Sequence, residues 1–391
     1  MTIREVGEHI EQYFIEIIRE QRHGTLDMLV NGLLFLFSRV YRRLVLFRLW
    51  LYNNRVIRNR AIGCLVISIG NLTCGGTGKT PVVEIFAKTL SKKGRKVAVL
   101  SRGYRSRDHR SFFAKLKEKF SSKKKEVPPR VVSDGQNLLL DSKTAGDEPY
   151  MLASNLKNVA VLVDKDRVKS GLYAIEKFQT DTLILDDGFQ YLKLMSHINI
   201  LLVDSTMPFD NHHVLPRGLM REPVHNIRRA DYIFLTKSDG SNRLRHLKSF
   251  LRKHNHRAEI IECCHRPQYL EDVFKRGNRY DLSWLKGKRT ASLSAIANPA
   301  SFNSFLLQNG AELVLERHYA DHHRYRQQEL IDFINDAKAA GAEVIMTTEK
   351  DAVRMPRLLR MDLPILFLRI EIDILSGQEN FDQSISRICF L

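Results

Sequence analysis

The sequence lacks the features that mark secreted, fibrous or membrane-spanning proteins. Its five cysteines are odd in number and show no disulfide or zinc-knuckle spacing, which indicates free thiols in a reducing cytoplasm. With 21 glycines and 11 prolines, the chain is neither fibrous nor broadly disordered. The first 21 residues carry five glutamates, so a signal peptide is not expected there. No uninterrupted apolar run approaches the about 18–20 residues that a membrane-spanning helix needs.

Positive charge is what the chain has in excess. Its 62 Lys and Arg against 44 Asp and Glu give a net charge of +18. Met28–Arg60 holds seven arginines and no acid, and Arg105–Arg130 holds ten Lys and Arg against three acids. This balance predicts an anionic partner, either an acidic membrane face or a phosphorylated substrate. Nucleic acid is not expected, because the basic stretches lack interleaved aromatic residues that would stack on bases.

The N-terminal region predicts amphipathic helices. Two apolar runs, Leu29–Phe37 and Leu44–Tyr52, are divided by Arg39, Arg42 and Arg43. At helical spacing these arginines share one face, which fits a helix lying in a membrane interface with its cations at the headgroups. The alternative is an ordinary docking helix whose apolar face covers the core. The absence of acids favours anionic lipid, and the first 21 residues are expected to form a separate amphipathic helix.

From residue 61 onward, short apolar runs alternate with helical patterns. This rhythm predicts an α/β fold of the P-loop NTPase type, a mostly parallel sheet with helices on both faces. The basic segment Arg105–Pro129 interrupts the rhythm as an insert, and from about Arg289 the pattern restarts as a smaller α/β unit. The expected domains are residues 1–55 (membrane-anchoring helices), 56–288 (the nucleotide-binding core, with the insert at 105–129) and 289–391 (the smaller α/β domain).

The strongest local signal is the segment Asn71–Thr80 (NLTCGGTGKT), which follows an apolar run and precedes a helix. Its glycines let backbone amides approach phosphate oxygens at a helix N-terminus. Lys79 would then reach the β- and γ-phosphates of ATP, and Thr80 would ligate Mg²⁺. Thr73 stands where the usual pattern has glycine. The predicted nucleotide-binding residues are Thr73, Gly75, Gly76, Thr77, Gly78, Lys79 and Thr80.

Three groups of acids and histidines are further candidates for chemistry. Asp186 ends an apolar run, where the Walker B metal ligand of a phosphate-loop protein belongs. The pair Asp147-Glu148 opens a predicted helix, where it could also serve as a cap. The segment Asp321–His323 places a carboxylate beside imidazoles, an arrangement that can orient a general base and that also occurs on ordinary loops.

One segment favours a different class of nucleotide-binding protein. Thr236–Asp239 (TKSD) follows an apolar run, as the guanine-reading segment does in phosphate-loop GTPases. A GTPase of the switch or metallochaperone type is therefore an alternative. A second alternative is a nucleotide-binding membrane scaffold without catalysis, which the amphipathic N-terminus would suit.

Taken together and in order, the motifs resemble those of the tetraacyldisaccharide 4′-kinase family, the lipid A 4′-kinases of Gram-negative bacteria. The resemblance covers about residues 28 to 370. It rests on TCGGTGKTP (73–81), SRGY (101–104), RVVSDG (130–135), GDEP (146–149), DDGFQ (186–190), LPRGLMREP (215–223), RAD (229–231), AIANP (295–299), DHH (321–323) and TEKDAVR (348–354).

This resemblance implies a reaction and roles for particular residues. The γ-phosphoryl of ATP would pass to the 4′-hydroxyl of a tetraacylated glucosamine disaccharide 1-phosphate to give lipid IVA. Asp147 would be the catalytic base, partnered by His322 rather than His323, with Mg²⁺ at Thr80 and Asp186. An N-terminal helix would anchor the protein to the cytoplasmic face of the inner membrane, where the acceptor would be bound. The protein is expected to be a monomer. The residues assigned to substrate binding are Arg102, Glu148, Asp187, Gln190 and Arg221.

The sequence departs from the family pattern at three places. Tyr191 stands where the family commonly has histidine, and Arg217 adds a cation to the proline-rich motif. The basic insert Arg105–Pro129 is longer than usual. We also expect domain closure to bring His322, from the smaller domain, towards Asp147.

Overall fold

The computed structural model describes residues 13–14, 16–18, 21–22, 24–103, 127–358 and 362–390. Most of the predicted N-terminal helix and of the basic insert lies outside these residues, as does Tyr104. The chain folds into two compact units, and the domain boundaries expected from the sequence stay a prediction. Unit 1 comprises Met1–Val97, Gln179–Cys264 and Ile374–Leu391, and unit 2 comprises Ala98–Phe178 and His265–Asp373.

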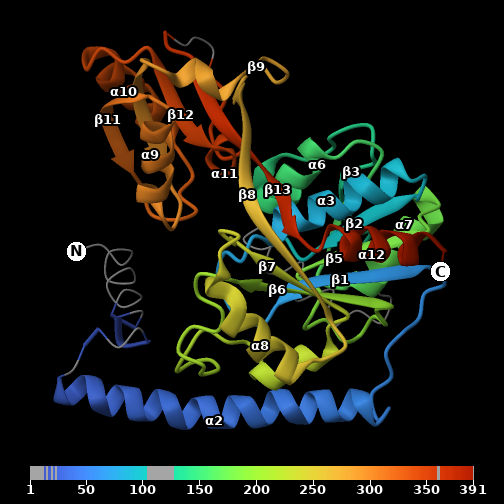
Figure 1. Cartoon of the computed structure of the whole chain (residues 1–391). Helices are drawn as coiled ribbons and strands as arrows, with labels where there is room; N and C mark the ends of the chain where they lie inside the picture. The colour runs from blue at the N-terminus through green and yellow to red at the C-terminus, as the bar shows by residue number, and fades with distance from the viewer. Residues whose placement is uncertain are drawn as a thin grey trace. The chain divides into compact units, whose positions relative to one another are not determined.

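Unit 1 is built on a parallel sheet with the strand order β8-β7-β6-β1-β5 (Figure 1). Strand β1 is buried at every position, and its Ile67 is in register with Ile184 of β5 and Ile198 of β6. Continuous apolar strands of this kind are typical of a parallel sheet covered on both faces. The strands are β1 (Leu65–Asn71), β5 (Thr182–Asp186), β6 (Ile198–Asp204), β7 (Tyr232–Thr236) and the first part of β8 (Glu259–Asp272).

Helices cover both faces of the unit 1 sheet. On one face, the ring of Phe234 in β7 packs edge to face with Phe86 of α3 and Phe381 of α12, at centroid distances of 5.6 and 6.4 Å. Its neighbour Ile233 points to the opposite face and joins a core that includes Leu251 of α8. The helices are α3 (Lys79–Lys92), α8 (Arg245–His254), α12 (Gln378–Phe390) and the 3-10 helix η1 (Val224–Arg229).

A single 29-residue helix, α2 (Thr25–Asn53), contains both apolar runs of the N-terminal region. The arginines between the runs do not break it, because arginine has a high helix propensity. The Tyr41 hydroxyl donates a hydrogen bond to the Arg221 carbonyl (3.1 Å), and Arg48 donates one to the Gln190 carbonyl (3.0 Å). Among the residues that the structure describes, no helix is both long and apolar enough to cross a membrane.

Unit 2 contains two groups of strands. In the first, β2 (Val97–Ser101, its first residue in unit 1) runs parallel to β4 (Ala160–Val163), and β3 (Arg130–Ser133) pairs antiparallel with β4. Helix α6 (Asp147–Asn155) packs against β3 and β4 and begins at the predicted acidic pair. The neighbouring helices are α5 (Ser142–Ala145) and α7 (Arg167–Phe178).

The second group is a parallel sheet with the order β11-β10-β12-β13. Ile345 of β12 packs with Phe333 of α10 on one face, and Met346 packs with Leu306 of α9 on the other. The two helices therefore cover opposite faces, as the alternation of strand side chains requires. The elements are α9 (Pro299–Gln308), α10 (Gln327–Ala339), α11 (Glu349–Ala352), β10 (Arg289–Ser294), β11 (Glu312–His318), β12 (Val344–Thr348) and β13 (Ile365–Ser376).

The predicted fold class, a mostly parallel sheet with helices on both faces, is confirmed. Antiparallel pairing joins β3 to β4 and β9 (Arg279–Tyr280) to β8. Two long strands carry the chain from one unit into the other: β8 after Cys264 and β13 after Asp373.

Candidate active-site residues

The predicted phosphate loop joins β1 to α3 in unit 1. Gly75 (φ 115°) and Gly78 (φ 76°) adopt left-handed backbone angles that favour glycine. A Cβ atom at Gly75 or Gly76 would meet no atom within 4 Å, so open space lies beside the loop for a ligand. The Thr77 carbonyl accepts a hydrogen bond from the Thr236 hydroxyl (2.9 Å), which fixes the loop to β7. The loop thus combines room for phosphate with the N-terminus of a 14-residue helix.

Four of the predicted residues come together beside this loop. Lys79 Nζ lies 3.7 Å from Asp187 Oδ1 and 3.4 Å from Asn71 Oδ1. Arg221 forms a two-pronged ion pair with Asp187, both distances being 2.8 Å. Gln190 donates a hydrogen bond to the Asn71 carbonyl (3.0 Å). Burial disfavours the charge of Arg221, but the hydrogen bond and ion pair with Asp187 outweigh it and raise the pKa of the guanidinium.

The predicted metal ligands are oxygens on the same two elements. Thr80 lies in the first turn of α3 and is buried. Asp186 is the last residue of β5 and is in register with Ile69 of β1, the strand that leads into the loop. The next residue, Asp187, has a left-handed φ of 58°, a backbone strain that clusters at functional sites. A hydroxyl and a carboxylate beside a phosphate-binding loop suit the hard cation Mg²⁺.

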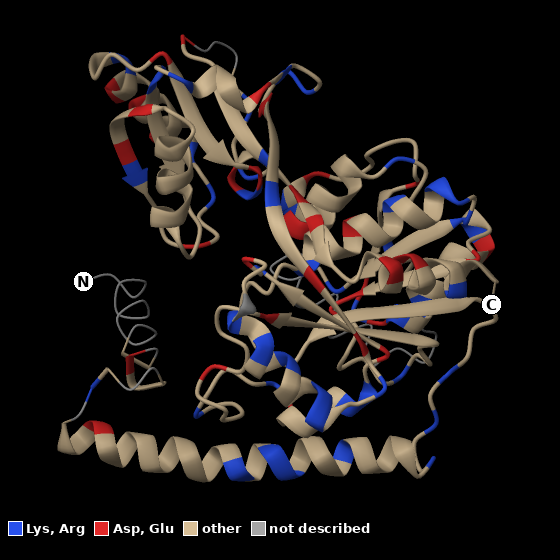
Figure 2. Cartoon of the chain, in the orientation of Figure 1, with Lys and Arg blue, Asp and Glu red and all other residues tan. Residues whose placement is uncertain are grey.

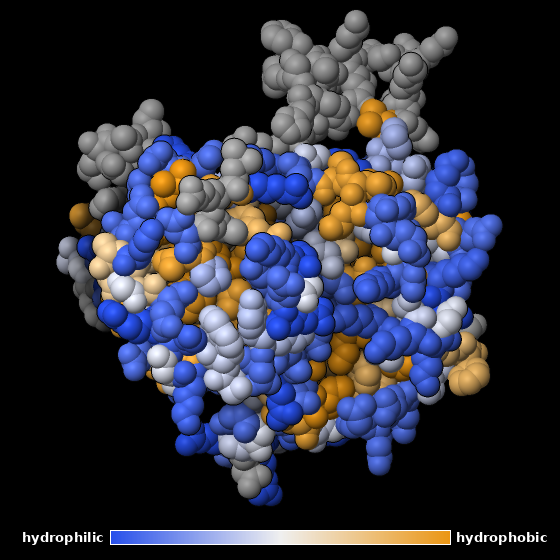
Figure 3. All heavy atoms as spheres, turned by 90° about the horizontal axis from the view of Figure 1, so that it is seen from above, coloured by the Kyte–Doolittle hydropathy of each residue, from blue (hydrophilic) through white to orange (hydrophobic). Residues whose placement is uncertain are grey.

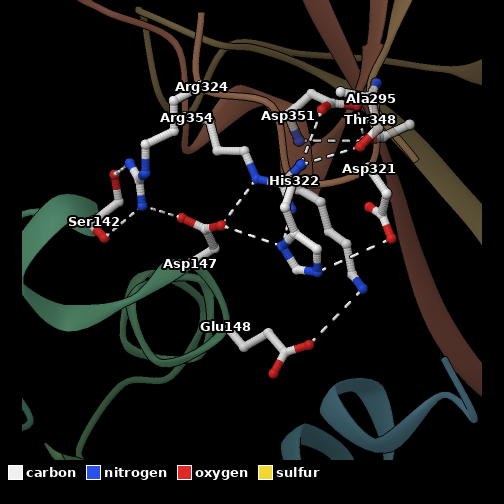
Figure 4. Close-up of polar contacts among 11 residues, drawn as sticks. Ser142, Asp147, Glu148, Ala295, Asp321, His322, Arg324, Thr348, Asp351 and Arg354 are labelled. Carbon is white, nitrogen blue, oxygen red and sulfur yellow. Dashed lines mark hydrogen bonds and ion pairs between the residues drawn. The ribbon is translucent and has the colours of Figure 1, made fainter. Parts of the chain in front are cut away.

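Asp147 is the centre of a charged cluster in unit 2 (Figure 4). One carboxylate oxygen, Oδ2, lies 2.9 Å from Arg354 Nε and 3.6 Å from His322 Nδ1. The other, Oδ1, accepts a hydrogen bond from Arg324, which also donates to the Ser142 carbonyl (3.0 Å). Burial raises the pKa of Asp147, but the contacts with His322 and the two guanidinium groups prevail and hold it below its usual value.

Arg354 holds the cluster together. Its side chain is 1% exposed, and it donates hydrogen bonds to the Ala295 carbonyl (3.1 Å) and to the buried Asp351 (3.3 Å). Its Nη2 lies 3.0 Å from His322 Nδ1. A guanidinium only donates, so Nδ1 accepts this hydrogen bond in the tautomer that carries the ring proton on Nε2.

His322 and its neighbour His323 have different surroundings. His323 Nε2 lies 2.9 Å from Glu329, and its ring stacks on Tyr319 at 4.5 Å. His322 instead faces Asp147 through Nδ1, and its Nε2 lies 4.0 Å from Asp321. The structure therefore places His322 in the charged cluster and His323 in local packing.

The other predicted site residues lie farther out or have structural partners. Glu148 is 3.9 Å from Lys350, and both side chains are partly exposed. Arg102 is exposed directly after β2. Arg217 is buried, with Nη1 3.5 Å from the Ile18 carbonyl, and Tyr191 closes a turn on the Gly188 carbonyl (2.7 Å).

Sequence reasoning missed two residues of the Asp147 cluster. Arg354 ends the TEKDAVR motif, whose residues have no chemical role that the sequence alone indicates. Arg324 directly follows the DHH motif. The sequence feature that could have predicted them is an arginine inside or beside a motif that also carries an acid. A buried arginine requires an anionic partner, so such an arginine is a candidate for an ion pair.

The lowered pKa of Asp147 predicts a pH dependence of stability. For a carboxyl with a depressed folded-state pKa, the stabilising contribution is full above the unfolded-state value of about 3.9. It is lost as the pH falls through the folded-state pKa. We therefore expect the difference in urea midpoint between wild type and Asp147→Asn to be constant near neutrality and to shrink below about pH 4. An unchanged difference down to about pH 3 would contradict the ionised, paired carboxylate.

These features define a class of protein. A glycine-rich loop between a buried parallel strand and a helix, with lysine, arginine and acids gathered beside it, is typical of the nucleotide site of P-loop phosphotransferases. A carboxylate kept ionised beside an imidazole is a type of group that can act as a general base. The protein is thus a kinase of the P-loop type.

The chain belongs to the tetraacyldisaccharide-1-P 4′-kinase family, whose sequence profile it matches over residues 30–389. It is 33% identical over 358 residues to the tetraacyldisaccharide 4′-kinase of Halothermothrix orenii, covering 89% of each chain. It is 37% identical over 363 residues to that of Anaeromyxobacter sp. strain K, covering 92% of this chain and 91% of the other.

A solved structure supports the same assignment. LpxK from Aquifex aeolicus, crystallised in complex with ATP, superposes with a TM-score of 0.70 at 27% identity, covering 92% of this chain and 99% of that one. The family predicted from the ordered motifs is confirmed, and the GTPase alternative is not favoured. Lys237 of the TKSD segment pairs with Asp204 at 2.5 Å.

Proposed function

We propose that the chain transfers the γ-phosphoryl group of ATP to the 4′-hydroxyl of tetraacyldisaccharide 1-phosphate, giving lipid IVA. The observation that carries this proposal is family membership over residues 30–389 together with an intact phosphate loop. The relatives named above are tetraacyldisaccharide 4′-kinases, and the Aquifex enzyme was crystallised with ATP. The reaction belongs to the biosynthesis of lipid A.

The residues beside the loop would bind and neutralise the triphosphate. Lys79 and Arg221 both contact Asp187, so two cations are already oriented around one acid at the end of β5. Backbone amides at the start of α3 add donors for the phosphate oxygens. Thr80 and Asp186 would hold Mg²⁺, which when bound offsets the negative charge of the transferring group. Most of the rate enhancement would come from this positioning and charge neutralisation.

Asp147 would accept the proton of the attacking hydroxyl. Its contacts with Arg354 and Arg324 keep it ionised, and His322 Nδ1 at 3.6 Å can take up the proton when it leaves the carboxylate. Protonation of Nδ1 would exchange its contact with Arg354 for a hydrogen bond to Asp147. Glu148, Gln190 and Arg102 are the remaining groups that we assign to substrate binding.

The replacement Asp147→Asn tests the base. Asparagine keeps the shape and removes the negative charge, so we expect kcat to fall by about 10²-fold, within the usual range for a general base. ATP binding should be retained, because the substitution leaves Lys79, Thr80 and the rest of the phosphate loop unchanged. The measurement is steady-state kinetics with isothermal titration of ATP. Full activity of the variant would exclude Asp147 as the base.

The helix α2 is proposed to hold the enzyme at an anionic membrane face. Its outer side carries exposed hydrophobic residues at helical spacing, among them Leu29 (67% exposed), Leu33 (56%), Leu36 (59%), Val40 (47%) and Leu44 (61%). On the face drawn in Figure 3, by contrast, hydrophilic residues predominate and hydrophobic ones form separate patches. An apolar stripe of this length suits burial in the headgroup and acyl boundary rather than in water.

The decisive experiment is a phosphoryl-transfer assay with the defined lipid. Purified full-length protein, ATP and the tetraacyl disaccharide 1-phosphate should give a 4′-phosphorylated product that thin-layer chromatography separates. GTP in place of ATP should support transfer poorly. Absence of product from ATP would show the substrate assignment to be wrong, and a preference for GTP would revive the GTPase alternative.

A further inference from the structure

Unit 1 contains a cavity of about 390 Å³ on the inner side of α2. It lies between this helix, the segment 212–225 and the C-terminal end of α8. The ring of Phe35 meets that of His213 edge to face at 5.7 Å, which joins the helix to the opposite wall. The lining residues best suited to an anion are Arg39, Arg42, His212, His213, His225 and His254.

The cavity is cationic without matching acids. Among the described residues that line it, none is an aspartate or a glutamate. Glu222, nearby in sequence, is buried and already pairs with Arg229 (2.5 Å) and Asn226 (2.7 Å). Burial together with the charges of Arg228 and Arg42 lowers the pKa of His225. A cavity lined by arginines, with no acid among its described lining residues, favours an anionic ligand.

The position of the cavity on α2 indicates which anion. The exposed apolar stripe of the helix lies on the side away from Arg42, so when the stripe faces acyl chains the cavity side of the helix faces the level of the headgroups. Figure 2 shows the cations of α2 in the C-terminal part of the helix and a second set on α8. Lipid phosphate is the anion found at that depth of a membrane, and arginine is suited to binding it through paired hydrogen bonds.

One wall of the cavity also supports the phosphate loop. Met220 lines the cavity and forms a β-bridge with Thr73, while Cys74 donates a hydrogen bond to the Leu219 carbonyl (2.7 Å). The next residue, Arg221, is the one paired with Asp187. An occupant of the cavity would therefore rest on the segment that positions Arg221.

We propose that this cavity binds the phosphate group of an anionic glycerophospholipid of the membrane, as a site separate from the loop that binds the nucleotide. The proposal rests on the proposed membrane association of α2 and gives that association a specific headgroup contact. Arg42 and Arg39 supply the charge, and the histidines supply further donors that take the phosphate oxygens as acceptors. The aliphatic part of the headgroup would pack on Val214 and Val224.

The test uses a soluble lipid, dihexanoyl phosphatidylglycerol below its micelle concentration, and the full chain. Titration calorimetry should detect binding to the wild type. Arg42→Gln should weaken it about tenfold, because one charged hydrogen-bonding group is lost. The matched control is Arg43→Gln, an exposed arginine on the same helix that does not line the cavity, with a change of less than about twofold expected. Circular dichroism verifies that both variants are folded.

Several outcomes would overturn the proposal. Equal losses in the two variants would mean diffuse attraction to a basic surface, and no binding to the wild type would leave the cavity without this ligand. Tighter binding of glucosamine 1-phosphate, with the same dependence on Arg42, would assign the cavity to the acceptor's own phosphate instead.

The kinase assay separates this proposal from the proposed function. It is run in neutral detergent micelles, which contain no anionic phospholipid. A wild type that is inactive towards the disaccharide there, and also in micelles that contain phosphatidylglycerol, counts against the kinase assignment alone. Phosphatidylglycerol binding that is unchanged in Arg42→Gln counts against the cavity alone.

Discussion

Replacing Lys79 with methionine is expected to lower kcat by about 10³-fold while the protein remains folded. Methionine keeps most of the side-chain length but removes the charge that lies 3.7 Å from Asp187 and faces the phosphate loop. That charge would act on the transferring phosphoryl group, where positioned cations have some of their largest effects on rate. Steady-state kinetics at saturating ATP measures the loss.

The matched control for Lys79 is Lys92→Met. Lys92 lies on the same helix, exposed in its last turn, so the replacement makes the same chemical change away from the loop. We expect its kcat to stay within about twofold of wild type, as is usual for a surface substitution. A loss of less than about tenfold in Lys79→Met, or equal losses in the two variants, would contradict the assigned role of Lys79.

Arg354→Met is expected to destabilise the protein by about 3–5 kcal/mol, the usual consequence of removing one partner of a buried charge pair. Asp351 is buried and receives hydrogen bonds from Thr348 and the Ala295 amide as well as from Arg354. Methionine would leave this carboxylate and Asp147 without their shared cation. Urea denaturation followed by circular dichroism gives the free energy of unfolding.

Two further variants separate charge from geometry at this position. Arg354→Lys keeps the charge but loses the planar fork that reaches Asp147, His322 and Asp351 together. Compared with Arg354→Met, Arg354→Lys should therefore recover more of the free energy of unfolding than of kcat. The double variant Arg354→Met/Asp351→Asn should be more stable than Arg354→Met, because the buried charge is gone. A decrease in the free energy of unfolding of less than about 1 kcal/mol in Arg354→Met would show that the cluster does not depend on this arginine.

The phosphate loop could be predicted because its information is local. Gly75, Gly78 and Lys79 lie within five consecutive positions, and the strand and helix on either side have clear apolar patterns. The Asp147 cluster was only partly predictable. The pairing of Asp147 with His322 was implied by the resemblance to a family. Spacing could not predict it, because 175 positions separate the two residues (322 − 147).

What the sequence did not predict depends on contacts between distant segments. Strand β8 was missed because CCHRPQYLED mixes charged and apolar residues without a regular period. The cationic cavity unites α2 with a segment about 170 positions later, and no pattern in either segment reveals the other. Arg354 and Arg324 were missed because a buried ion pair has no periodic signal in one sequence.

The dual attachment of Arg354 also affects how variants of this protein behave in living cells. The same guanidinium supports the proposed base and compensates a buried carboxylate, so a change there weakens chemistry and folding at once. A loss of a few kcal/mol in folding free energy can lower steady-state abundance several-fold through proteolysis. Growth-based selections would therefore report a combined penalty at this position, and immunoblotting of protein amount is needed before any such phenotype is attributed to turnover.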